Sequence, residues 1–300
     1  MIILFICYAV IYNLVYIISM HKEQEVDIYE QSITTTFRQP LWSRFLKGLH
    51  EYSLINEGDV ICVCISGGKD SMVLAKLFMA YSKFMNDKIQ IKYLVMNPGY
   101  NQKNIDLIKH NLETLHIPAE IHETNIFDIA NAQTKSPCFL CAKMRRGALY
   151  NIAKEMGCNK IALGHHYDDV IETTLMNLLS SGSFQTMLPK LHSTNFEGME
   201  LIRPMYYIRE KDIIRFAKAH DLHFLNCACR FTERSENGEL ESRRKYIKQL
   251  IKELKKNIPQ VEKNLFVAPD NVTLDMILGY KKGGEYHSYL NDYDKKIISF

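Results

Sequence analysis

The sequence predicts an α/β protein with a doubly wound, mostly parallel sheet and a helical C-terminal extension. Three observations indicate this fold class. Strand-like and helix-like segments alternate from residue 60 to residue 180, which is typical of βαβ units. The first strand, VICVCI at 60–65, is apolar throughout, as expected of a strand that is covered on both faces. It runs directly into a glycine-rich turn and a helix, a junction at which such sheets bind ligands.

The elements before this strand follow from hydrophobic spacing. Residues 21–39 are polar, and we expect them to be loosely ordered. From Pro40 the stretch PLWSRFLKGLHEYSLI has apolar residues at helical spacing, with the proline at a tolerated first-turn position. Residues 56–59, Asn-Glu-Gly-Asp, then form a turn that leads into the strand.

The alternation continues after the first strand and defines the rest of the core. We expect helices at 71–85, 103–115, 142–156 and 169–180, and strands at 89–96, 119–123 and 160–163. Further helices are expected at 209–221 and 239–257, and the residues after Pro259 give no assignable pattern. The chain then divides into an apolar stretch at 1–20, an α/β core at 40–225 and a cysteine-bearing helical extension at 226–300.

Composition excludes some classes and leaves the partner open. The 300 residues suit one large domain or two modest ones, and 47% apolar with 24% charged residues is ordinary for a globular protein. A formal net charge of +3 is too small to indicate a partner. Eight cysteines do not make a disulfide scaffold. The pairs Cys138–Cys141 and Cys227–Cys229 point to metal or redox chemistry in a reducing compartment, and the two cysteines of the apolar strand are expected to be inert core.

The first 19 residues carry no charged side chain and are long enough to span a membrane. They lack the basic segment and the small-residue cleavage site of a secretory signal. Two interpretations stay open: a membrane tether, or an upstream extension of a chain that starts at Met20. The remainder of the chain predicts a cytoplasmic protein.

The turn at 66–71, SGGKDS, joins the apolar strand to a helix. Its glycines let the backbone approach a ligand, and the first N–H groups of the helix point at that ligand. The serines and the lysine add donors, and Asp70 is a candidate for binding Mg²⁺. A Walker A motif would need a glycine where Val63 stands, and the dinucleotide pattern G-x-G-x-x-G is absent. The turn therefore predicts a phosphate site of another type.

A second junction, GHHYDD at 164–169, follows the strand at 160–163. Ligands of open α/β sheets bind at the carboxyl ends of the strands, so both junctions can face one ligand. Asp169 is a candidate for contacting Mg²⁺ or a nucleotide. The alternative is that Asp168 and Asp169 only cap the helix. The adjacent histidines diverge from a strand end, which favours packing or phosphate contact over metal ligation.

The turn matches the S-G-G-x-D-S loop of the PP-loop ATP pyrophosphatases, whose fold is adenine nucleotide alpha hydrolase-like. Within that family the chain most resembles the tRNA 2-thiocytidine synthetases (cytidine 2-sulfurtransferases), over about residues 40 to 268. The further motifs that support this resemblance are Cys138-Phe-Leu-Cys141, Lys143-Met-Arg-Arg-Gly147, Leu163-Gly-His-His-Tyr-Asp-Asp169, Met187-Leu-Pro-Lys-Leu191, Arg203-Pro204 and Arg209-Glu-Lys-Asp-Ile213. The resemblance implies a tRNA sulfurtransferase that splits ATP to AMP and pyrophosphate while it activates a carbonyl oxygen.

The resemblance also implies an ATP site. Its expected residues are Ser66, Gly67, Gly68, Lys69, Asp70, Ser71, Met72, Met96, Gly164 and Asp169. Met96 follows the second strand, where the family contacts adenine through backbone groups; plain core is the alternative for this residue. The residues expected to act in catalysis are Lys69, Asp70, Asp169, Cys138 and Cys141, with the two aspartates serving Mg²⁺ or the nucleotide.

Family members hold a [4Fe–4S] cluster with three thiolates and leave one iron open for an exogenous sulfide. The resemblance assigns these ligands to Cys138, Cys141 and Cys227. Cys229 would supply a fourth ligand and so permit a closed zinc site, although zinc sites usually prefer C-x-x-C over C-x-C spacing. A redox disulfide between Cys138 and Cys141 is the third interpretation.

Residues 243–256, RRKYIKQLIKELKK, contain seven basic residues and one acidic residue. At helical spacing the lysines share one face and the apolar residues share the other, which suits binding to a phosphate backbone. A solvated helix that binds nothing is the alternative. With the resemblance, tRNA becomes the expected partner. The candidate RNA contacts are Arg145, Arg146, Arg243, Arg244, Lys248 and Lys252; Arg203 and Arg209 are further candidates, or ion-pair partners.

In the implied mechanism, ATP adenylates the C2 oxygen of an anticodon-loop cytidine, and cluster-bound sulfur then displaces AMP. A sulfur donor such as a cysteine desulfurase and a second copy of the chain are the expected protein partners. Residues 180–185 depart from the family's glycine-rich stretch, which leaves the target base open. The alternatives are a thiolase acting on another tRNA base such as uridine, a tRNA lysidine-type ligase, and a non-catalytic, membrane-tethered, zinc-stapled nucleotide sensor.

Overall fold

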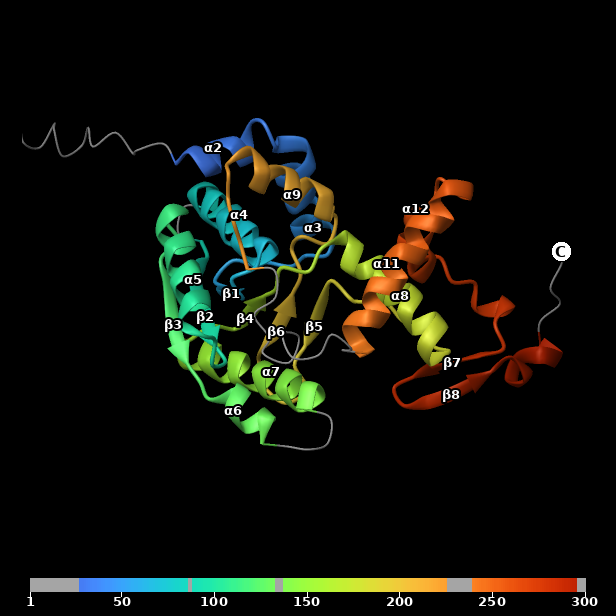
Figure 1. Ribbon diagram of the computed structural model, residues 1–300. Coiled ribbons are helices and arrows are strands. Elements are labelled where there is room, and N and C mark those ends of the chain that lie inside the picture. The colour runs from blue at the N-terminus through green and yellow to red at the C-terminus, as the bar shows by residue number, and fades with distance from the viewer. Residues whose placement is uncertain (1–26, 86–87, 133–136, 226–238, 296–300) are drawn as a thin grey trace, which may run out of the picture. The chain divides into compact units, whose positions relative to one another are not determined.

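The computed structural model describes residues 27–85, 88–132, 137–225 and 239–295 (Figure 1). The chain forms two compact units. The first comprises Met1–Asp169 and Leu188–Gly238, and the second comprises Val170–Met187 and Glu239–Phe300. The apolar stretch at 1–20, with its two open interpretations, lies outside the described residues. Within the described ranges, no helix is both long enough and apolar enough to cross a bilayer.

The first unit is built on a six-stranded sheet in the order β3-β2-β1-β4-β6-β5. Its strands are β1 (Val60–Ile65), β2 (Gln90–Asn97), β3 (Ala119–Glu123), β4 (Lys160–Ala162), β5 (Lys190–His192) and β6 (Glu200–Ile202). All neighbouring pairs are parallel except β5 with β6. This arrangement confirms the predicted fold class. The edge hairpin of β5 and β6 has strands too short to be recognised from periodicity.

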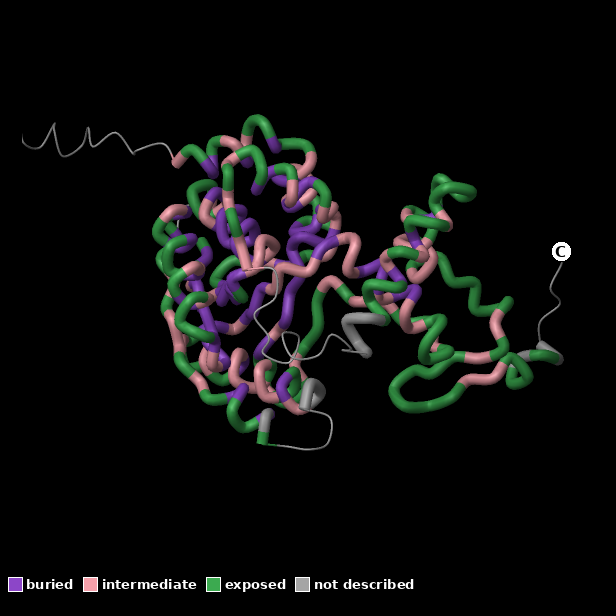
Figure 2. The backbone as a smooth tube through the Cα atoms, in the orientation of Figure 1, coloured by how far each residue is buried: buried purple, intermediate pink, exposed green. Residues whose placement is uncertain are grey.

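Helices cover both faces of the sheet, and the alternation of β1 explains why its whole sequence is apolar. Ile61, Val63 and Ile65 pack into a core with α3 (Ser43–Glu51), α4 (Lys69–Met85), α5 (Gln102–Thr114) and α9 (Glu210–Ala219). Cys62 and Cys64 point to the other face, where they pack with α7 (Pro137–Glu155). Figure 2 shows the buried residues concentrated along the strands and the inner sides of these helices. A short helix, α6 (Ile126–Asn131), is an addition that the sequence pattern did not indicate.

The expectation of loose order over 21–39 is wrong from residue 27 onward. Helix α2 (Ile28–Thr34) begins at Asp27, whose carboxylate accepts the N–H groups of Tyr29 and Glu30 at 3.0 Å each. Tyr29, Ile33 and Phe37, spaced four residues apart, are buried. A π-helical turn at Arg38–Trp42 then leads into α3. The helix predicted from Pro40 is therefore present, but it begins at Ser43, and Pro40 lies in the π-helical turn before it.

Helix α2 is held to α4 by a buried lysine. The side chain of Lys76 is fully buried, and its Nζ lies 2.7 Å from Asp27 Oδ2 and 3.1 Å from Glu30 Oε1. It also donates to the carbonyl of Leu115 at 2.9 Å. A buried ammonium is costly unless it is paired. Lys76 can therefore be buried on α4 only when α2 packs beside it and supplies the carboxylates of Asp27 and Glu30.

The second unit contains the rest of α8 (Tyr167–Ser181), α11 (Glu239–Asn257) and α12 (Val261–Val267), and a two-stranded sheet of β7 (Gly279–Lys282) and β8 (Glu285–Ser288). The bounds of α11 are those predicted. Ile247 and Ile251 are buried while Lys245 and Lys252 are exposed, which confirms the amphipathic pattern. The antiparallel hairpin β7–β8 is an element that the unassigned tail did not reveal.

The Lys76 network gives a stability prediction. We expect Lys76→Met to lower the free energy of unfolding by about 3–5 kcal/mol, because it removes the buried cation that Asp27 and Glu30 share. Lys83→Met is the matched control, since Lys83 pairs with the same Glu30 but its side chain is 57% exposed. The control should change stability by about 1 kcal/mol or less. Urea denaturation measures both, and equal effects of the two variants would contradict this role for Lys76.

Candidate functional site

The turn between β1 and α4 is held in one shape by its own hydrogen bonds. Ser66 N donates to Ser71 Oγ at 3.1 Å, and Ser71 Oγ donates to the carbonyl of Gly68 at 2.9 Å. Gly67 has a φ of +86°, and a Cβ there would lie 2.7 Å from Ile108 Cγ1. Gly67 is therefore required both by its backbone conformation and by the closeness of its neighbours.

The second junction, between β4 and α8, lies directly against this turn. A Cβ added to Gly164 would lie 3.0 Å from the carbonyl carbon of Asp70 and 3.0 Å from the backbone nitrogen of Ser71. Both of these atoms belong to the backbone and cannot rotate away. The two junctions thus meet through backbone contact, as their places at the ends of parallel neighbouring strands predict.

A cavity of about 340 Å³ opens at this meeting point. That volume is within the range of small-molecule sites. Its lining includes six of the expected ATP residues, namely Ser66, Asp70, Ser71, Met96, Gly164 and Asp169. Gly67, Gly68 and Lys69 belong to the same turn but do not line the cavity, and the side chain of Met72 is fully buried in the core.

The lining also contains residues that were expected to have another role or none. Cys64, expected to be inert core, is buried but faces the cavity. Arg145, expected to contact RNA, lines it as well. His165 lines the cavity, whereas His166 is turned away from it and buried, so the two histidines diverge as predicted.

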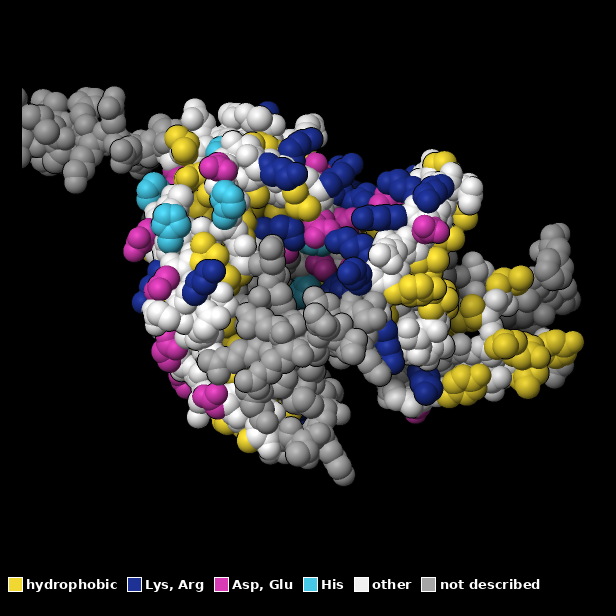
Figure 3. Space-filling view, in the orientation of Figure 1, with side chains coloured by type: hydrophobic (Ala, Val, Ile, Leu, Met, Phe, Trp, Pro, Cys, Tyr) yellow, Lys and Arg dark blue, Asp and Glu magenta, His cyan; other side chains and the backbone are white. Residues whose placement is uncertain are grey.

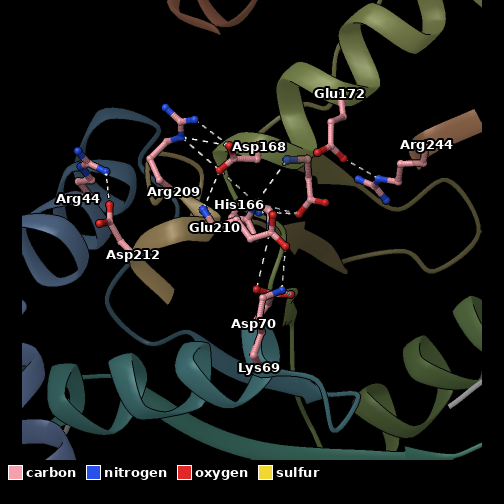
Figure 4. A network of polar contacts seen from close by, with 11 residues as sticks. Arg44, Lys69, Asp70, His166, Asp168, Glu172, Arg209, Glu210, Asp212 and Arg244 are labelled. Carbon is pink, nitrogen blue, oxygen red and sulfur yellow. Dashed lines mark hydrogen bonds and ion pairs between the residues drawn. The ribbon is translucent and has the colours of Figure 1, made fainter. Parts of the chain in front are cut away.

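Buried His166 lies among the carboxylates of the site (Figure 4). Its backbone N–H donates to Asp169 Oδ2 at 2.9 Å, and the Asp169 N–H donates back to His166 Nδ1 at 3.4 Å. In the neutral ring this leaves the proton on Nε2, which lies 3.7 Å from Asp70 Oδ1. His166 is therefore hydrogen-bonded to Asp169 and lies beside Asp70, between the aspartates of the two junctions. This position of His166 was not predicted from the sequence.

Asp70 has the chemistry of a cation ligand. Burial raises the pKa of its carboxyl, and Asp169 adds to the rise against the attraction of His166 and Lys69. Its Oδ1 is buried, and within the part of the chain that the structure describes it accepts no hydrogen bond. A buried carboxylate oxygen of this kind fits Mg²⁺, which binds one or two protein carboxylates together with substrate phosphates. In the same described ranges, no three His, Cys, Asp or Glu side chains by themselves form a metal site.

Lys69 lies between two carboxylates. Its Nζ is 3.1 Å from Asp70 Oδ2 and 3.1 Å from Glu210 Oε1. Burial lowers the pKa of Lys69, but the two carboxylates together outweigh it, and the net shift is upward. Lys69 is therefore a cation at neutral pH. Glu210 was missed because nothing near it in the sequence predicts contact with a turn about 140 residues earlier; its place in the Arg209–Ile213 motif was the only signal.

A second ion pair joins the start of α8 to the start of α9. Asp168 Oδ1 accepts from Arg209 Nη2 at 2.9 Å, and Asp168 Oδ2 accepts from the Glu210 N–H at 2.7 Å. Arg209, a candidate for either RNA binding or ion pairing, is thus an ion-pair partner. The pair places Glu210 where it can reach Lys69.

The structure describes the expected cluster ligands only in part. The helix expected at 142–156 begins earlier, at Pro137. The C-x-x-C pair therefore lies inside the first turns of α7, whereas the expected bounds placed it before the helix. Cys141 is 4% exposed and packs in the core. The side chain of Cys138 and all of Cys227 and Cys229 lie outside the described residues. Positions 138 and 141 share a helix face, and thiolates three residues apart fit an iron–sulfur cluster or zinc.

The candidate RNA contacts differ in their surroundings. In the first unit Arg146 is exposed. In the second unit Lys252 and Arg243 are exposed, and Lys248 is half-buried. Arg244 Nε donates to the buried Glu172 at 3.0 Å, so its charge is partly neutralised. RNA binding by these residues stays a prediction.

Comparison with known proteins identifies the relatives of this chain. Residues 39–254 match the model of the PP-loop domain family. The chain is 36% identical over 234 residues to a tRNA-cytidine(32) 2-sulfurtransferase of Geotalea uraniireducens, covering 77% of this chain and 90% of the relative. It is 34% identical over 229 residues to the enzyme of that name from Geobacter metallireducens, covering 75% and 87%.

A solved structure is similar as well. The U34-tRNA thiolase NcsA from Methanococcus maripaludis, solved with its [4Fe-4S] cluster, superposes with a TM-score of 0.59 at 25% identity. The match covers 76% of each chain.

The contact at Gly164 gives a prediction for nucleotide binding. We expect Gly164→Ala to weaken ATP binding about tenfold or more, because the new Cβ must displace the backbone of the turn. Gly147→Ala is the matched control, since a Cβ at Gly147 in α7 meets no atom within 4 Å. Titration calorimetry with a non-hydrolysable ATP analogue measures both variants. Unchanged affinity in Gly164→Ala would show that the turn does not need this contact.

Proposed function

This chain belongs to the tRNA-cytidine(32) 2-sulfurtransferase family of PP-loop proteins and is therefore a tRNA-thiolating transferase; we propose that its target is a cytidine. In this proposal the enzyme replaces the C2 oxygen of a tRNA cytidine with sulfur in an ATP-dependent reaction. The observation that carries the proposal is the cavity at the two meeting junctions. It is lined by the turn serines, by Asp70 and Asp169, and by Met96 at the end of β2. This is a combination of phosphate donors, cation ligands and an apolar wall suited to a nucleotide.

In the first step, the cytidine C2 oxygen attacks the α-phosphorus of ATP, and the bond from that phosphorus to pyrophosphate breaks. The N–H groups at the start of α4, the serine hydroxyls and the Lys69 ammonium stabilise the charge on the departing pyrophosphate. Asp70 and Asp169 would hold Mg²⁺, which neutralises phosphate charge when bound. The product is a base whose C2 oxygen carries AMP, a much better leaving group than the oxygen alone.

In the second step, sulfur at the oxidation level of sulfide forms a bond to C2. The bond from C2 to oxygen breaks, and AMP leaves with that oxygen, so the step involves no net oxidation. Cys138, Cys141 and Cys227 would hold a [4Fe–4S] cluster, which supplies the sulfur when bound. The chain's own contribution is to keep Lys69 and Asp70 fixed through Glu210 and His166. A protein sulfur donor such as a cysteine desulfurase would restore the sulfur, and a second copy of the chain remains an expected partner.

One observation favours another target base. The similar NcsA structure is that of a thiolase of tRNA uridine 34, which shares the fold over three quarters of the chain. The same two steps apply to the C2 oxygen of uridine. The reaction type therefore does not distinguish cytidine from uridine as the target base, but identification of the thionucleoside that is formed does.

Nucleoside mass spectrometry tests the proposal directly. Deletion of the gene should remove 2-thiocytidine from bulk tRNA, and the wild-type gene should restore it. Loss of a thiouridine with unchanged 2-thiocytidine would favour the uridine alternative. An unchanged set of thionucleosides would overturn the proposed function.

Asp70 gives a prediction for the purified enzyme. We expect Asp70→Asn to lower tRNA-dependent AMP formation about 100-fold or more, because it removes a charged cation ligand without changing shape. Asp106→Asn is the matched control, an exposed carboxylate on α5 that contacts Gln102. A raised pKa means that Asp70 takes up a proton as pH falls, beginning at a higher pH than an ordinary aspartate. Mg²⁺-dependent ATP binding by the wild type should therefore weaken as pH falls and Asp70 becomes protonated. This pH dependence should be absent in Asp70→Asn. Equal AMP formation in both variants would contradict this role.

A further inference from the structure

The first unit has a second pocket, of about 370 Å³, between α3 with the turn before it and α9. Its charged lining consists of Arg44 and Lys47 from α3 and Lys211, Asp212 and Arg215 from α9. We propose that this α3–α9 pocket binds phosphodiester groups of the tRNA backbone. The proposal rests on the proposed function, because it names a second contact surface for the same substrate.

The charge of the pocket is strongly one-sided. Asp212, whose side chain is 7% exposed, is its one carboxylate among the described lining residues. Asp212 Oδ2 accepts from Arg44 Nη1 at 3.0 Å, and Oδ1 lies 3.8 Å from Arg215 Nη2. A buried carboxylate between two guanidinium groups orients both of them toward the pocket but can neutralise only one. The four cations therefore leave a large positive excess.

The remaining cations keep their charge accessible. Lys211 is exposed and has no ion-pair partner among the residues that the structure describes. Lys47 Nζ pairs with Glu51 Oε2 at 3.6 Å one helical turn away, but both side chains are exposed, so this pair cancels little of its charge. Lys47 Nζ also lies 4.1 Å above the ring of Tyr207, and the Arg215 guanidinium lies 5.3 Å from the ring of Phe37. Aromatic rings hold a cation in place without cancelling its charge. Figure 3 shows Lys and Arg side chains gathered over α3 and α9 on this face of the first unit.

Helix α9 connects this pocket to the nucleotide cavity. Its first residue, Glu210, contacts Lys69 of the turn, and the next two residues line the pocket. Arg215 follows within about 7.5 Å along the helix axis. The close-up in Figure 4 includes both the Arg44–Asp212 pair and Glu210. A tRNA whose target base enters the cavity therefore brings neighbouring phosphates past these cations.

The arrangement favours a polynucleotide over a free anion. A single phosphate is satisfied by one or two cationic side chains, as at a bidentate arginine. Here four cations are spread over two helices, and the phosphates of ATP already have donors in the turn. A chain of phosphates is the ligand that uses all four.

A charge-matched pair of variants tests this surface. The test variant is Lys47→Gln/Lys211→Gln, and the control is Lys103→Gln/Lys109→Gln, two exposed lysines on α5. Binding of the full chain to tRNA is measured by fluorescence anisotropy over a range of KCl concentrations. We expect the test variant to bind roughly tenfold more weakly and to lower the slope of log K against log salt by about 1.4 to 1.8, as for two lost phosphate contacts. ATP affinity and the melting temperature should equal those of the control.

The outcomes separate this inference from the proposed function. If the wild type binds and thiolates tRNA but the two variants have the same affinity and salt slope, the α3–α9 pocket is not an RNA contact and the proposed function stands. If the wild type neither binds nor thiolates tRNA, both fail. Titration with inorganic phosphate at constant ionic strength tests a free anion: phosphate binding that the test variant loses, with tRNA affinity unchanged, would also overturn the inference.

Discussion

The site depends on one backbone contact, that of Gly164 with the peptide between Asp70 and Ser71. Parallel pairing of β1 with β4 brings the ends of both strands to the same edge of the sheet. Only a residue without a side chain then lets the two helix starts come together. The cavity forms where the two junctions meet, and an aspartate from each junction, Asp70 and Asp169, lines it.

Bringing two helix starts together also concentrates acidic side chains, and the structure balances them in pairs. Asp168 is neutralised by Arg209, while Lys69 lies between Asp70 and Glu210. His166 lies between the aspartates of the two junctions. In the proposed reaction a polyphosphate adds further negative charge here, which explains why a lysine with a raised pKa and a half-buried carboxylate suited to Mg²⁺ lie side by side.

Strands β1 to β4, most helices and both junctions could be predicted because each depends on one short stretch of sequence, such as VICVCI followed by SGGKDS. The strands of the two hairpins are too short to show a periodic pattern, and the other features that escaped prediction depend on contacts between distant residues. Helix α2 looked polar because only two of its buried residues, Tyr29 and Ile33, are apolar, and its partner Lys76 is far along the chain. Glu210 meets Lys69 only after folding, and the α3–α9 pocket draws its cations from two segments more than 160 residues apart. Hydrophobic periodicity shows which residues of one segment share a face, so it cannot predict such pairs.

The central claim is that the C2 oxygen of the target base is joined to AMP before sulfur replaces it. Isotope transfer tests this most directly. A tRNA with ¹⁸O at C2 of the target cytidine is incubated with the reconstituted enzyme, ATP and sulfide under anaerobic conditions, and the AMP is analysed by mass spectrometry. The account predicts one ¹⁸O in AMP for each thionucleoside formed. Unlabelled AMP alongside thiolated tRNA would contradict it.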